Sequence, residues 1–85
     1  CTRFYDTTQT KAALHGVIGP VDRAGGVVLS GHTDVVPVEG QDWQSDAFVL
    51  HGDDDMLFGR GACDMKGFLA CVLARVPQMV RANLN

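Results

Sequence analysis

Residues 30–37 and 59–67 hold the side chains whose types and spacing could perform chemistry. His32 and Asp34 stand two positions apart, directly after the apolar run 26–31. In an extended segment such positions point to the same side, so both side chains can face one cavity. A neutral imidazole is a common zinc ligand, and a nearby carboxylate can fix its tautomer. The pattern indicates a metal site, although H-x-D alone fits equally well a His at a strand end beside a solvated Asp.

A second acidic position, Asp64, follows a Gly-Arg-Gly turn and precedes an apolar helical pattern. Its two carboxylate oxygens could each hold one metal ion, and two-metal hydrolytic sites keep their ions roughly 3.5–4 Å apart. The alternative is an Asp that only caps the helix expected to start near Met65, because such caps are common. His32 and Asp64 therefore predict a two-metal site, provided that the fold brings them together.

The two stretches LSGHTDVVP (29–37) and GRGACDMKG (59–67) resemble the two leading signatures of a zinc exopeptidase and deacylase family. That family includes acetylornithine deacetylases, succinyl-diaminopimelate desuccinylases, aminoacylases and glutamate carboxypeptidases. The resemblance implies that His32 binds one zinc ion, that Asp64 bridges both zinc ions, and that Asp34 is the catalytic-site aspartate. It also implies a cis peptide bond after Asp64.

Within the family, the stretches VEGQDW (38–43) and CDMKGF (63–68) most resemble acetylornithine deacetylases. Three positions depart from the usual pattern without touching a proposed ligand, and they concern the choice of subfamily: Ala13, Ala47 and Phe58. Desuccinylases and aminoacylases are the alternatives inside the family. A non-catalytic α/β module that binds a partner is the alternative outside it.

The resemblance carries a set of expectations for the whole enzyme. It implies hydrolysis of the small molecule N2-acetyl-L-ornithine to ornithine and acetate, in arginine biosynthesis in the cytoplasm. It implies two Zn²⁺ ions, with Co²⁺ as a possible replacement, and a homodimer. The general-base glutamate, the remaining ligands and the dimerisation domain would lie beyond Asn85. Residues 1–85 would then be the N-terminal part of the catalytic domain, and this chain alone should show no measurable activity.

Composition limits the other classes of function. The formal net charge is −3, and no basic cluster offers a footprint for nucleic acid or an anionic membrane. The longest apolar run, 68–74, is too short to span a bilayer. The three cysteines show no C-x-x-C spacing, which favours reduced thiols over a disulfide framework or a thiolate zinc site. An apolar content of 46% is that of a globular core.

The elements that must position these residues follow from local patterns. Residues 2–5 and 11–18 predict a hairpin across the polar turn 6–10. The run 26–31 predicts a strand buried on both faces of a central sheet. Residues 33–49 lack periodicity, which indicates a long functional loop.

The second half predicts a turn, a strand and a helix. The acidic turn 53–55 leads into a strand at 56–58, and apolar spacing of three and four predicts a helix from Asp64 onward. Pro77 should kink or divide that helix. Strand, loop, strand and helix indicate the α/β class, as part of a three-layer α/β/α catalytic domain like that of the zinc exopeptidases.

The remaining candidates favour structural roles. His15 is expected at a surface or partly buried strand position, and His51 beside a solvated hairpin turn, because the acidic spacing does not follow a calcium-binding EF-hand loop. Cys63 is expected to be buried as a small apolar residue. Other expectations are carboxylate partners for Arg60 and Lys66, packing against the loop for Trp43, and core positions for Met65, Phe68 and Val72.

Overall fold

The computed structural model describes residues 1–83, which contain four short strands and one long helix. The chain divides into two compact units. One unit is Cys1–Gly26 with the chain from Val76 onward, and the other is Val27–Arg75. All of the candidate site residues lie in the second unit.

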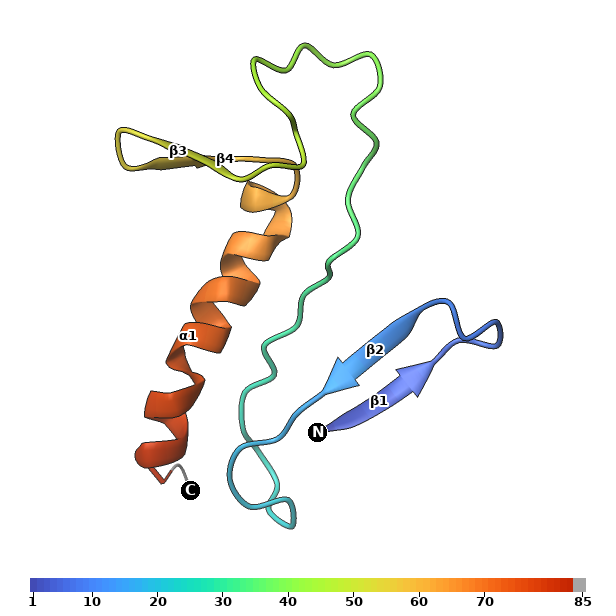
Figure 1. The fold of residues 1–85 in the computed structure, drawn as a ribbon. Helices are drawn as coiled ribbons and strands as arrows, with labels where there is room; N and C mark the ends of the chain where they lie inside the picture. The colour runs from blue at the N-terminus through green and yellow to red at the C-terminus, as the bar shows by residue number, and fades with distance from the viewer. Residues whose placement is uncertain (84–85) are drawn as a thin grey trace. The chain divides into compact units, whose positions relative to one another are not determined.

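The first unit opens with an antiparallel hairpin of β1 (Thr2–Tyr5) and β2 (Ala12–His15), drawn in blue in Figure 1. The carboxylate of Asp6 organises the connecting turn, since it accepts hydrogen bonds from the Thr8 hydroxyl and from the backbone N–H of Lys11. These bonds favour the charged form, with Thr8 as the larger cause, and they lower the pKa of Asp6 below its usual value of 3.8. The predicted hairpin and polar turn are confirmed.

The second unit contains another antiparallel hairpin, formed by β3 (His51–Asp53) and β4 (Met56–Phe58). The two residues between the strands, Asp54 and Asp55, have φ values of 42° and 64°. Asp tolerates this left-handed region, and positive φ at both central positions is typical of a tight hairpin turn. His51 therefore lies on an exposed strand beside a solvated turn, as predicted.

The helix of the structure is α1 (Gly67–Arg81), preceded by the wide turn Ala62–Lys66. It remains one helix through Pro77, so the expected division at this residue is wrong. Proline removes a single N–H donor, and the bonds of the flanking turns are sufficient to keep the helix continuous here.

The apolar stripe of α1 is only half-buried. Phe68, expected in the core, is 40% exposed, whereas Met65 and Val72 are half-buried. The half-buried positions of α1 recur at the spacing of one helix face and are Leu69, Val72, Val76 and Met79. Ala47 is the one buried apolar residue in the described part of the chain.

The prediction of a buried strand at residues 26–31 is wrong. This segment is extended but belongs to no strand, and Val27 and Val28 are 86% and 90% exposed. A strand buried on both faces needs neighbours that hydrogen bond to its edges and side chains that cover it. The described strands pair only with each other, as β1 with β2 and β3 with β4.

The described residues thus combine two small sheets with one helix, as expected for part of an α/β domain. The three-layer arrangement stays a prediction. No helix within residues 1–83 combines the length and the apolar character that crossing a membrane requires.

Candidate metal centre

The extended segment that follows Gly31 carries His32 and Asp34. A Cβ atom at position 31 would lie 2.6 Å from Leu69 Cδ2 and 3.1 Å from Met65 Cε. Glycine therefore lets this segment pass close to Leu69 of α1 and to Met65, which follows Asp64 in the turn before the helix. The loop expected at residues 33–49 is confirmed, because that stretch contains no helix or strand.

Asp64 lies in the turn Ala62–Lys66, which Gly61 begins with a φ of 82°. The backbone N–H of Lys66 donates to the carbonyl oxygen of Gly61 at 2.8 Å, which closes the turn. The peptide bond between Asp64 and Met65 is cis, as the resemblance implies. No hydrogen bond to the backbone of residues 1–83 involves the Asp64 side chain, so the structure does not support a capping role for it.

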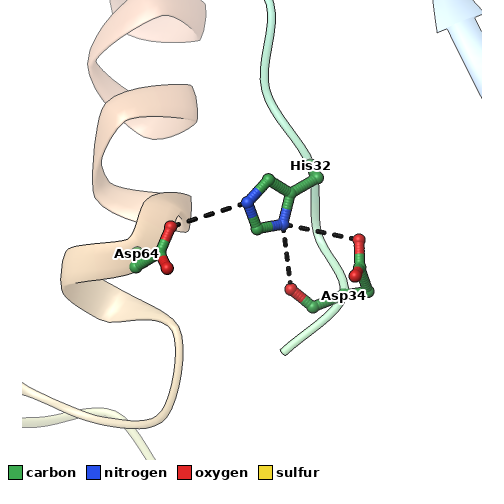
Figure 2. Close-up of polar contacts among 3 residues, drawn as sticks. All are labelled: His32, Asp34 and Asp64. Carbon is green, nitrogen blue, oxygen red and sulfur yellow. Dashed lines mark hydrogen bonds and ion pairs between the residues drawn. The ribbon is translucent and has the colours of Figure 1, made fainter. Parts of the chain in front are cut away.

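His32 lies between the two aspartates (Figure 2). Its Nδ1 is 3.1 Å from the carbonyl oxygen of Asp34 and 3.4 Å from Asp34 Oδ1. Its Nε2 is 3.5 Å from Asp64 Oδ1. The His32 side chain is half-exposed, and both carboxylates are open to solvent. The fold therefore brings together the three residues that the sequence singled out.

The nitrogen and oxygen atoms that face each other here are of the types that bind metal ions. A proton on Nδ1 of His32 satisfies the bond to the Asp34 carbonyl, and Nε2 then presents its lone pair toward Asp64 Oδ1. In this tautomer both atoms are acceptors, and a bound metal ion is a cation that both could coordinate.

The spacing of the two acceptors agrees with zinc coordination. Zn–N and Zn–O bonds of about 2.0–2.2 Å at a tetrahedral angle place two ligand atoms about 3.4 Å apart. The observed separation of 3.5 Å therefore needs almost no adjustment. Within residues 1–83, however, no three His, Cys, Asp or Glu side chains form a group that could hold a metal ion. The chain thus offers part of a ligand set, and the roles of His32, Asp34 and Asp64 stay predictions.

A pocket of about 500 Å³ opens in front of these residues. Its wall includes the three candidate site residues together with Trp43, Arg60 and Cys63. Cys63 is exposed, so its predicted burial is wrong: the turn that carries it lies in the pocket wall and no side chain covers it.

The contacts of Arg60 also differ from the predicted pairing with a carboxylate. Its guanidinium donates to Gln41 Oε1 and lies 5.1 Å from the ring centroid of Trp43, in place of a carboxylate partner. Trp43 is half-buried and packs within the loop, as expected. Sequence reasoning missed Gln41, because a lone glutamine in a loop carries no distinctive spacing.

The comparison with known proteins bears on the same part of the chain. Residues 28–85 match the profile of Peptidase family M20/M25/M40. The chain belongs to this family. The matched region includes His32, Asp34 and Asp64, and the assignment confirms the predicted membership of a metallohydrolase family.

Three similar M20 relatives are succinyl-diaminopimelate desuccinylases. They come from Legionella pneumophila strain Lens, Stenotrophomonas maltophilia strain K279a and Xanthomonas campestris pv. campestris strain B100. Each is 46% identical to this chain, over 70, 69 and 72 residues respectively. These stretches cover 81%, 80% and 84% of this chain, but only 17%, 17% and 18% of the relatives.

The M20 chain therefore spans less than a fifth of the length of the curated relatives that it matches. No solved structure gives a significant match. The relatives carry the name of the predicted alternative within the family, desuccinylase, and not that of acetylornithine deacetylase.

Proposed function

We propose that this chain is the N-terminal part of the catalytic domain of a metal-dependent hydrolase that cleaves the amide bond of an N-acylated amino acid. The observation that carries the proposal is the approach of His32 Nε2 to Asp64 Oδ1, 3.5 Å, at the edge of a pocket. Membership of the M20 family supports the reaction class.

His32 and Asp64 would hold the metal, with Asp34 orienting the imidazole through Nδ1. Two Zn²⁺ ions, or Co²⁺ in their place, would polarise the acyl carbonyl and activate water for attack. His32 contributes a neutral nitrogen whose other ring position is held by Asp34. Asp64 contributes a carboxylate with two oxygens, which suits a bridging position between two ions. The general base and the other ligands would come from the part of the enzyme that follows this sequence in the family.

The substrate class we favour is an N-succinyl amino acid, N-succinyl-diaminopimelate, because three desuccinylases share 46% of the aligned residues. N2-acetyl-L-ornithine, in arginine biosynthesis, is the second candidate, and the stretch 38–43 supports it through its likeness to acetylornithine deacetylases. For the complete enzyme we propose a cytoplasmic homodimer built on a three-layer α/β/α catalytic domain, with a small-molecule substrate and neither nucleic acid nor a membrane as partner.

Metal titration of the chain tests this proposal. Co²⁺ binding is followed by visible absorption, and Zn²⁺ binding by competition. We expect weak binding by the chain as it stands, and at least tenfold weaker binding after His32→Ala or Asp64→Asn, because each removes a direct ligand. His51→Ala is the matched control, since it removes an exposed imidazole on β3. Equal affinity of His32→Ala and the unchanged chain would refute the metal site and favour a non-catalytic binding module.

Segment exchange tests the substrate class. The matching residues of a desuccinylase and of an acetylornithine deacetylase are each replaced by those of this chain. We expect hydrolysis to persist in the desuccinylase host and to depend there on His32. Activity that survives only in the deacetylase host would move the assignment to N2-acetyl-L-ornithine.

A further inference from the structure

The side chain of Gln41 lies outside the pocket wall but forms hydrogen bonds with three residues of that wall. The Gln41 amide nitrogen Nε2 donates to the carbonyl oxygen of Pro37 at 3.0 Å. Its oxygen Oε1 accepts from Trp43 Nε1 at 3.2 Å and also from Arg60 Nη2. Pro37, Trp43 and Arg60 all line the pocket beside the candidate metal ligands, whereas Gln41 does not.

A primary amide supplies both functions that these three bonds use. The contact with Pro37 needs a donor, and the contacts with Trp43 and Arg60 need an acceptor. A carboxylate would supply only the acceptor, and an ammonium group only the donor. A tight turn places the amide: the backbone N–H of Gln41 donates to the carbonyl of Val38 at 3.1 Å, and Gly40 has a φ of 74°.

Arg60 depends on this arrangement. Its backbone N–H is fixed by the carbonyl of Ala47 at 2.6 Å, so the main chain is anchored independently of the side chain. The guanidinium lies over Trp43, and its Nε is buried without a hydrogen-bond partner among the described residues. Gln41 Oε1 is therefore the acceptor that holds the guanidinium against the ring. Without it, Arg60 Nη2 and Trp43 Nε1 both lose a partner, and rotation toward water is favoured.

We propose that Gln41 is a positioning residue that fixes Trp43 and Arg60 in the wall of the pocket that receives the acylated substrate. The proposal rests on the proposed function for the meaning of the pocket, but the contacts themselves are independent of metal and catalysis. Gln41 acts through its neighbours and has no direct role at the metal.

Trp43 is the single tryptophan of the chain, so its fluorescence reports the wall directly. Acrylamide quenching is measured for the metal-free chain and for three variants: Gln41→Met, Gln41→Glu and the matched control Gln44→Met, at an exposed loop position. We expect the quenching constant to rise roughly threefold in Gln41→Met, because the half-buried ring loses its restraints. Gln41→Glu should be quenched less than Gln41→Met, since it loses the donor to Pro37 but keeps the acceptor for Trp43 and Arg60. Gln44→Met should show no change.

Two outcomes would overturn the proposal: a Gln41→Met chain quenched like the unchanged one, or a Gln41→Glu chain as exposed as Gln41→Met. Helical circular dichroism identifies loss of the whole fold, and if Gln41→Met loses it, the Gln41→Glu comparison decides. Co²⁺ affinity should be the same in all three variants. The hydrolase proposal is tested separately by Co²⁺ binding, which His32→Ala should weaken. The hydrolase proposal and the positioning role of Gln41 can therefore fail independently.

Discussion

Replacing Gly61 with alanine tests whether the turn that carries Asp64 depends on its close approach to Val35. Gly61 has a φ of 82°, and a Cβ atom there would lie 2.6 Å from Val35 Cγ1. Gly40 is the matched control, because its φ is 74° and a Cβ there would meet nothing within 4 Å. Both glycines therefore have a left-handed backbone, but only at Gly61 would an added methyl group enter an occupied space.

The magnitudes separate the two effects. A left-handed alanine costs about 1–2 kcal/mol relative to the allowed regions. Forcing a methyl group into an occupied space costs about a further 1–3 kcal/mol. We therefore expect Gly40→Ala to lower the free energy of unfolding by about 1–2 kcal/mol, and Gly61→Ala to lower it by about 2–5 kcal/mol.

The assay is urea unfolding followed by Trp43 fluorescence, since Trp43 lines the same pocket as Gly61. Val35→Ala, alone and combined with Gly61→Ala, completes a double-mutant cycle. The combination should recover about 1–3 kcal/mol, which is the steric part of the cost. Equal losses for Gly40→Ala and Gly61→Ala, or no recovery with Val35→Ala, would refute the steric argument.

The other predictions concern the site, the first hairpin and activity. Asp34→Asn should weaken Co²⁺ binding by about 10–100-fold, because it removes the carboxylate beside His32 Nδ1, whereas Asp42→Asn, an equal change of charge in the same loop, should not. NMR titration should place the pKa of Asp6 below 3.8, and Thr8→Ala should raise it. Since the folded pKa is the lower one, the charged Asp6 stabilises the β1–β2 turn above about pH 3.8, and this contribution is lost as the pH falls through the folded pKa. Purified chain mixed with Zn²⁺ should hydrolyse neither N-succinyl-diaminopimelate nor N2-acetyl-L-ornithine. A rate of hydrolysis proportional to the chain concentration would contradict the conclusion that the chain holds only part of the metal ligands.

The sequence by itself determined the features that depend on near neighbours. The two hairpins follow from turn residues between short β-forming runs, and the helix follows from apolar spacing of three and four. The spacing of His32 and Asp34 places both on one segment, where the imidazole contacts the neighbouring carbonyl. The order of the two signatures was enough to identify the family that the profile match assigns.

Only the tertiary structure decided which residues are covered and which residues meet across the chain. Val27 and Val28 have the composition of a buried strand yet lie exposed, because burial depends on partners distant in sequence. Arg60 contacts Trp43 and Gln41, not a carboxylate, because the turn at 38–41 brings an amide oxygen to its guanidinium. Local preferences act over a few bonds of the chain, whereas burial and pairing depend on which distant segments the fold brings into contact.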